Sequence, residues 1–180
     1  EGIPGEGATD HAWVENIKID LSEHTGKVGF IGFEYVAEGG ASKSTTYRLD
    51  NIKSGKDGSD PTPEPSDDPF GLDVSNPQTT FEANFNEIDA YNKDYSLEGW
   101  VNKAIQGVNV WQSGITNDSK YIKANPYKVA SGEIMECWFI TPAFTVSAFN
   151  KFTFDCTGGN WQDNMQLKVY FLQKNSAGQV

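Results

Sequence analysis

The chain has 180 residues and a formal net charge of −11, with 14 basic against 25 acidic residues. Phosphate binding needs a basic footprint, so this charge argues against nucleic acid as a partner and against docking on an anionic membrane. No apolar run approaches the roughly 20 residues of a membrane span. The chain is rich in aromatic residues for its polarity, and these favour half-buried sheet surfaces.

Three strand-like segments precede residue 55, at 13–21, 27–37 and 45–52. In the second, Gly29 and Gly32 interrupt the alternation, which indicates a bulge or a close approach of another chain segment. In the first, alternation predicts that four apolar side chains share one face: Trp13, Ile17, Ile19 and Leu21.

The segment 56–69, KDGSDPTPEPSDDP, is an acidic, proline-rich linker that holds five carboxylates and four of the eight prolines. Such a composition stays extended and resists burial. We expect it to act as a spacer between two parts of the chain.

Beyond the linker, strands are predicted at 79–85, 135–146, 151–156 and 165–172, and the stretch 86–128 reads as a long polar loop. On the last segment Leu167, Val169 and Phe171 are expected to share a face. Short strands separated by Gly, Pro and Asn turns predict an all-β antiparallel β-sandwich of the jelly-roll type.

The two sides of the linker each look incomplete. A lone three-stranded sheet from 1–55 would leave an apolar face wet, and 70–180 lacks clear closing strands. We therefore predict that 1–55 is the C-terminal half and 70–180 the N-terminal half of a jelly roll. The halves are permuted or split around the linker, and they pair either within one chain or by swapping between chains or tandem repeats.

Several phrases carry a family resemblance: TTFEANF, EGWVN with WQSG, ECWFITPAFTV, KFTFDC, WVENIKIDLSEHTGKVGFIGFEY and TTYRLDNI. Together they resemble the choice-of-anchor J type domains of Bacteroidetes surface lipoproteins, relatives of cleaved-adhesin domains and of MAM jelly rolls. In that family the phrase that starts at Trp13 would follow the one that ends near Leu172, so the order here is inverted. The resemblance implies a jelly roll with a binding or adhesive role outside the cell, on the outer-membrane surface or secreted, whose signal or anchor lies outside this sequence.

In jelly rolls of this kind the first and last strands lie side by side, which would bring Glu82 to Asp50, with Asn51 near them. Calcium takes six to eight oxygen ligands from carboxylates, amides and carbonyls. These residues are the predicted calcium site, and the alternative is that they are ordinary exposed strand and turn residues.

A sugar site is the second candidate. Trp161 lies between glycines and amides in TGGNWQDN, with Asn160 and Asp163 beside it. An exposed Trp stacks on a pyranose ring while amides and carboxylates bind its hydroxyls. The alternative is that Trp161 fills the sandwich core, which is the reading we prefer for Trp100 and Trp111.

Two cysteines, Cys137 and Cys156, fit no zinc-site spacing. They are either buried thiols or, in an exported protein, a disulfide. No catalytic motif is present, so we expect a noncatalytic binding or adhesion module for a glycan or a surface protein. One alternative is a structural spacer that exchanges strands, as a swapped homodimer or in repeats. A weaker alternative is a hydrolase fragment.

Overall fold

The computed structural model describes residues 3–5, 8–40, 45–54, 68–117, 119–147, 151–161, 166–175 and 180. Within these residues the chain is a β-sandwich of two antiparallel sheets, as the sequence predicts, and the one helical element described is a short 3-10 turn, η1 (Ser22–His24). No helix in the described part of the chain is long and apolar enough to cross a membrane.

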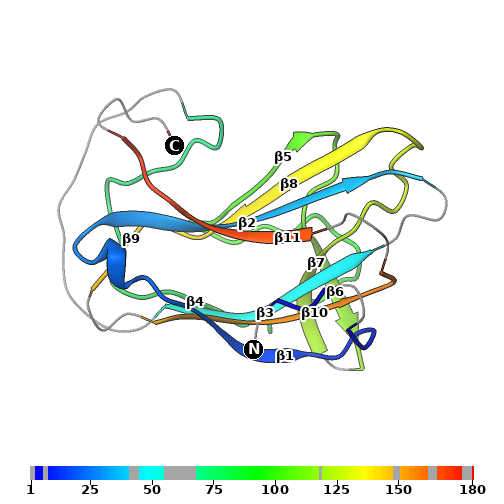
Figure 1. Cartoon of the computed structure of the whole chain (residues 1–180), viewed down its shortest axis with the longest axis horizontal. Helices are drawn as coiled ribbons and strands as arrows, with labels where there is room; N and C mark the ends of the chain where they lie inside the picture. The colour runs from blue at the N-terminus through cyan, green and yellow to red at the C-terminus, as the bar shows by residue number, and fades with distance from the viewer. Residues whose placement is uncertain are drawn as a thin grey trace.

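Figure 1 shows the two sheets as stacked layers. The first sheet has the order β1-β10-β3-β7-β6, with β4 added beside β3. Its strands are β1 (Val14–Ile19), β10 (Phe152–Gly159), β3 (Thr46–Ser54), β7 (Ser119–Ala124), β6 (Gln112–Thr116) and β4 (Glu82–Ala83). The second sheet has the order β11-β2-β8-β5, with β9 beside β2. Its strands are β11 (Gln166–Leu172), β2 (Val28–Glu38), β8 (Ile134–Ile140), β5 (Val101–Gln106) and β9 (Phe144–Thr145).

The strands from the two sides of the linker interleave within one chain. In the first sheet β3 lies between β10 and β7, and in the second sheet β2 lies between β11 and β8. The segment 45–52 also lies beside 79–85, because Ile52 of β3 pairs with Ala83 of β4. Of the linker, only Asp68 and Pro69 lie within the described residues.

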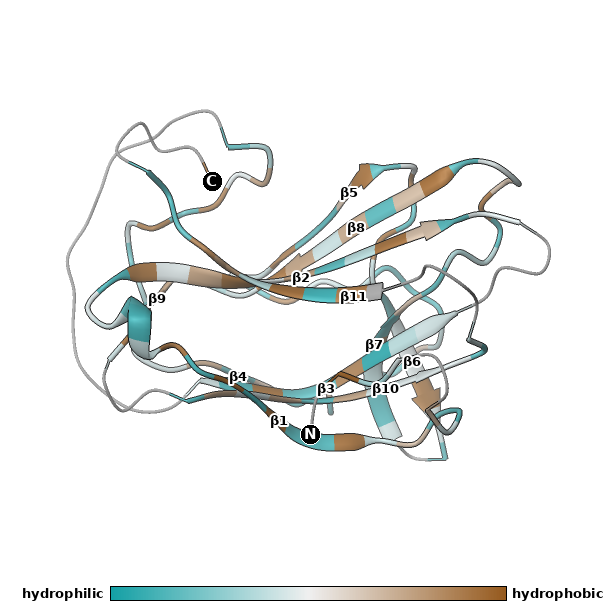
Figure 2. Cartoon of the chain, in the orientation of Figure 1, coloured by the Kyte–Doolittle hydropathy of each residue, from teal (hydrophilic) through white to brown (hydrophobic). Residues whose placement is uncertain are grey.

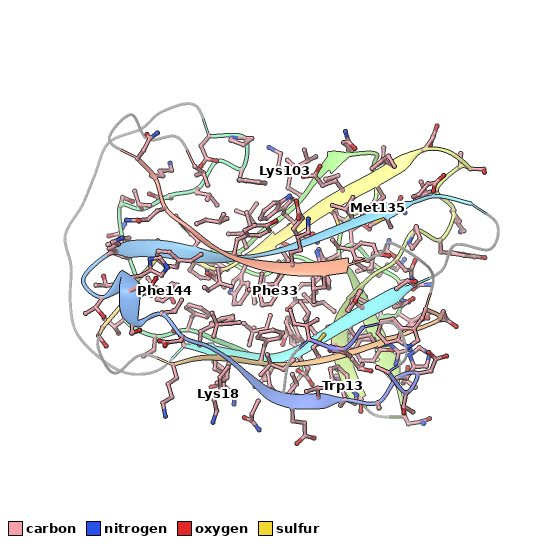
Figure 3. The ribbon with its side chains drawn as sticks, in the orientation of Figure 1. Trp13, Lys18, Phe33, Lys103, Met135 and Phe144 are labelled. Carbon is pink, nitrogen blue, oxygen red and sulfur yellow. The ribbon has the colours of Figure 1, made fainter. Side chains whose placement is uncertain are left out.

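An aromatic core fills the space between the sheets (Figure 3). Phe33 of β2 is fully buried, and its ring centroid lies 5.1 Å from that of Phe154 and 6.0 Å from that of Phe152, both on β10 of the other sheet. Figure 2 shows brown and pale stretches along β2 and β8, whose apolar side chains divide between this core and a second cluster that contains Phe30, Trp138 and Ile140. The cysteines, one per sheet, are buried and free, and burial raises the pKa of both thiols.

A bulge in β1 changes the predicted face of Trp13. The register shifts between Val14 and Ile17, where Asn16 has a φ of 53°. Because the extra residue reverses the alternation, Ile17 faces the core while Trp13 faces the outside and packs edge-on against Tyr121, with ring centroids 6.0 Å apart. The prediction that Trp13 shares a face with Ile17 is therefore wrong.

The glycines of β2 do mark close approaches. A Cβ at Gly29 would overlap the Phe171 ring, and one at Gly32 would lie 2.8 Å from Leu172 and 2.9 Å from Trp138. The predicted alternation of β11 also holds, since Leu167, Val169 and Phe171 pack against the main core.

The stretch 86–128, expected to be a polar loop, contains β5, β6 and β7. β5 and β6 are only partly buried, and β7 buries Lys123 among its apolar residues, so these sequences lack the apolar richness of β2. One signal was available: Thr116 pairs with Ser119, and Asn117, which follows Thr116, has a φ of 48°, a left-handed conformation that Asn favours in tight hairpin turns.

Candidate functional site

A groove of about 460 Å³ lies on the outer face of the first sheet. Residues of β3, β7 and β6 line it, together with residues of nearby loops. We call it the β7 groove. The described residues that line it are Thr46, Arg48, Tyr91, Asn92, Asn109, Gln112, Lys123, Asn125, Tyr127, Lys128 and Asn160. Small-molecule sites commonly occupy roughly 300–1,000 Å³, so a short oligosaccharide or a similar ligand fits this volume.

Strand register builds the floor of the β7 groove. Arg48 of β3 pairs with Lys123 of β7, and Lys123 pairs in turn with Gln112 of β6. Side chains of directly opposed residues point to the same face of a sheet. Since the neighbours Leu49 and Ile122 face the core, these three polar side chains face outward.

Two exposed tyrosines flank this floor. Tyr91 is 53% exposed and Tyr127 is 66% exposed. The Lys123 ammonium lies 3.9 Å from the Tyr91 ring centroid, and the Lys128 ammonium lies 5.6 Å from that of Tyr127. Both rings thus offer aromatic surface at the groove.

Side-chain amides supply most of the remaining lining. They are Asn92, Asn109, Gln112, Asn125 and Asn160. Some are held in place: Gln112 Nε2 donates to Asp94 at 2.9 Å, and Asn125 Oδ1 accepts from the Tyr127 N–H at 3.0 Å. Each primary amide has both a hydrogen-bond donor and an acceptor, so the groove can bind ligand groups that both donate and accept hydrogen bonds.

The N-terminal segment lies against the end of β10, next to the groove residue Asn160. Asp10 Oδ1 accepts from the Asn160 N–H at 3.2 Å, and the His11 N–H donates to the Gly158 carbonyl at 2.7 Å. Burial and then the nearby Arg48 guanidinium lower the pKa of His11, against a smaller opposite effect of Asp10. This edge therefore carries a carboxylate that is engaged by backbone and an imidazole biased towards its neutral form.

Of the predicted sugar-binding residues, Asn160 lines the groove, Trp161 is not among its lining residues, and Asp163 lies outside the described residues. The Trp161 Nε1–H donates to the Ala8 carbonyl at 2.9 Å, and its ring covers Gly158 so closely that a Cβ there would overlap it. It also packs edge-on against Tyr47, with centroids 5.7 Å apart. Trp161 is thus half-buried and tied to the chain around it.

The predicted calcium ligands do not converge on one point. Glu82 lies opposite Lys53 and forms an ion pair with it at 2.8 Å. Asp50 instead lies opposite Asp155 of β10, and Asn51 Nδ2 donates to Asp155 Oδ2 at 2.7 Å. Among the described residues, no group of three or more His, Cys, Asp or Glu side chains is placed to hold a metal ion, and the calcium ion stays a prediction.

Asp155 joins two bulges instead. Asn16 in β1 and Asn51 in β3 both have positive φ, at 53° and 48°, and both lie where the register shifts beside β10. Asp155 Oδ1 accepts from the Asn16 N–H at 2.6 Å, and its Oδ2 accepts from Asn51. One carboxylate therefore fixes the kink of both neighbouring strands.

We expect Asp50→Asn to stabilise the protein at pH 7. Burial raises the pKa of Asp50 from 3.8 to about 6, the Asn51 backbone N–H opposes this, and Asp155 adds to it. The stability that this group contributes is complete below pH 3.8 and is lost as the pH rises to about 6. After discounting for partial solvent screening, the gain at pH 7 is roughly 1–2 kcal/mol.

Urea unfolding of both proteins at pH 4 and pH 7, in EDTA, measures this effect. The advantage of Asp50→Asn should be present at pH 7 and shrink at pH 4, and a variant less stable than the wild type at pH 7 would contradict it. Repeating the pH 7 series with calcium tests the predicted ion: an unchanged wild-type Tm would rule it out.

Sequence reasoning missed Tyr91 and Tyr127 because both lie in segments read as loop, far apart from each other and from β3. The cross-strand pair of Arg48 and Lys123 depends on the register of β3 against β7, and β7 itself was not predicted. The available signal was local: Tyr-Asn at 91–92 and Asn-Pro-Tyr at 125–127 both place an aromatic beside an amide in a polar stretch.

Comparison of the chain with family models, with curated proteins and with solved structures gives no match. Functional inference therefore starts from the geometry of the β7 groove.

Proposed function

We propose that this chain is a noncatalytic binding module, on a bacterial cell surface or secreted, that holds a carbohydrate in the β7 groove. The observation that carries the proposal is the joint presence of two exposed tyrosines and five side-chain amides around one concave site. The family resemblance supports an adhesive role outside the cell.

The chemistry of the groove matches that of a sugar. Each hydroxyl of a pyranose both donates and accepts a hydrogen bond, as each primary amide does. The C–H face of the ring is apolar and stacks on an aromatic ring, which Tyr127 offers with little of its surface covered. A site with a few placed polar groups and aromatic walls is the usual form of a small-ligand pocket.

We expect Tyr127→Ala to weaken glycan binding by about tenfold or more, which corresponds to about 1.4 kcal/mol. Tyr127 is the cleaner target, because Tyr91 also covers Lys123. A glycan array identifies the ligand, and isothermal titration calorimetry then measures its Kd for each variant. The matched control is Tyr170→Ala, which removes a partly exposed tyrosine from β11, in the other sheet.

Three outcomes separate the hypotheses. If Tyr127→Ala loses glycan binding and Tyr170→Ala keeps it, the β7 groove is the binding site. If Trp161→Ala is folded but loses binding, while Tyr127→Ala binds as the wild type does, the glycan binds at the Trp161 loop instead. A protein that binds no glycan and forms a concentration-dependent dimer would favour the assembly module, and release of shortened glycan would favour the hydrolase.

A further inference from the structure

The β7 groove is basic in an acidic protein. Its described lining contains three cationic side chains, Arg48, Lys123 and Lys128, and no Asp or Glu. The chain as a whole has 25 acidic residues against 14 basic ones. The two carboxylates recorded beside the groove, Asp10 and Asp94, are each bonded to an amide group of a lining residue.

Lys123 is the most buried of these three cationic residues. The residue is only 6% exposed, and its ammonium forms no ion pair or hydrogen bond with any described residue. The contact of the ammonium with the Tyr91 ring is worth roughly 0.5–2 kcal/mol, as for other cations over an aromatic face. An anion placed against this cation would add a charge-assisted hydrogen bond.

Arg48 adds a second charge directly opposite. It pairs in register with Lys123 across β3 and β7, and like charges in directly opposed positions of a sheet destabilise it. Its guanidinium carbon lies 4.8 Å from the Tyr121 ring centroid, and its Nε is buried with no hydrogen-bond partner. Arg48 and Lys123 are thus neighbouring cations on one face of the sheet, and neither forms an ion pair with a described residue.

We propose that the β7 groove recognises an acidic saccharide, one whose sugar carries a carboxylate or a sulfate that lies against Arg48 and Lys123. This inference rests on the proposed function and specifies its ligand class. Arg48 supplies a planar donor group that fits either oxyanion, and Lys123 supplies a point charge. The amides and Tyr127 bind the hydroxyls and the ring face of the same ligand.

The test starts from a glycan array that carries neutral, uronate-bearing and sulfated oligosaccharides. Calorimetry then compares two matched pairs, polygalacturonate with its methyl ester and dextran sulfate with dextran, and the pair that binds tells the carboxylate from the sulfate. The charged member of that pair should bind at least tenfold more tightly, and its affinity should fall as salt is raised, because exposed charges are screened. Poly-glutamate is the control for charge without sugar.

Lys123→Met and Arg48→Gln should each weaken binding of the charged ligand by about tenfold, while binding of its neutral partner stays within about twofold. Lys123→Met keeps an unbranched apolar chain against Tyr91, and Arg48→Lys keeps the charge and should retain more affinity than Arg48→Gln. The matched control is Lys18→Met, on the edge strand β1, where the side chain points away from the sandwich (Figure 3). A Tm no lower than that of the wild type establishes that each variant is folded, and loss of the like-charge pair can raise it.

The outcomes separate this inference from the proposed function. If every array glycan is ignored, the proposed function fails. If neutral glycans bind as tightly as acidic ones and the two substitutions change nothing, the sugar site stands and the acidic ligand is excluded. Poly-glutamate binding as tight as that of the acidic glycan would show that the groove selects charge alone, which also overturns the inference.

Discussion

Phe33→Ala is expected to lower the free energy of unfolding by about 3–5 kcal/mol, the usual cost of truncating a buried phenylalanine. Phe33 is fully buried and contacts Phe152 and Phe154 across the sandwich. Its loss removes apolar burial and two aromatic contacts between the sheets, and leaves a cavity. Because the free energy of unfolding of a domain is only about 5–15 kcal/mol, this loss is a large fraction of its stability.

Urea denaturation followed by tryptophan fluorescence measures this change. Phe33→Leu should cost less, about 1–2 kcal/mol, because most of the volume is kept. Val108→Ala, at an exposed loop residue, should change stability by less than about 0.5 kcal/mol. A loss below about 1 kcal/mol for Phe33→Ala would mean that the two sheets are not packed around this ring.

Gly114→Ala is expected to cost about 1–3 kcal/mol and to weaken ligand binding as well. A Cβ at Gly114 would overlap the Tyr121 ring across β6 and β7. That ring moves aside only by disturbing its contacts, because Trp13 packs against it, Arg48 lies over it and its hydroxyl shares a 2.7 Å hydrogen bond with Thr116. Displacing Tyr121 shifts Arg48, and with it the floor of the β7 groove.

A double-mutant cycle separates this clash from a general effect of replacing glycine. Tyr121→Leu should be destabilising alone, yet the Gly114→Ala, Tyr121→Leu protein should be more stable than the sum of the two changes predicts. Gly5→Ala is the control, since nothing lies within 4 Å of a Cβ there. Strict additivity would show that the Tyr121 ring does not limit this position.

The class of fold could be predicted because the local sequence of its most apolar strands is enough to identify them as strands. β2 and β8 are apolar enough to be recognised without context, and β11 alternates cleanly. The three strands of the 86–128 stretch could not be recognised in this way. β5 and β6 are partly exposed and β7 buries a lysine, and each is placed by pairing: β5 with β8, β7 with β3, and β6 with β7. The face of Trp13 depended on a single bulge at Asn16, which alternation alone does not reveal.

The site was harder to predict than the fold. Trp161 was the most conspicuous aromatic beside amides, but its neighbour Gly158 lets the ring settle onto the backbone of β10. The β7 groove instead combines residues from β3, β6, β7 and four separate loops. Of the predicted ligand residues only Asn160 proved to line it, because its place at the end of β10 is set by the sheet itself.

The interleaving of the strands also sets the order of events during synthesis. β2 and β3 leave the ribosome early, yet β2 pairs with β8 and β11, and β3 with β7 and β10, which lie later in the chain. At 5–20 residues per second, roughly 100 residues separate β3 from β10 by on the order of ten seconds. Contacts of such long sequence separation slow folding. Until β8 and β11 are made, the apolar strand β2 therefore lacks the partners that flank it in the folded sheet.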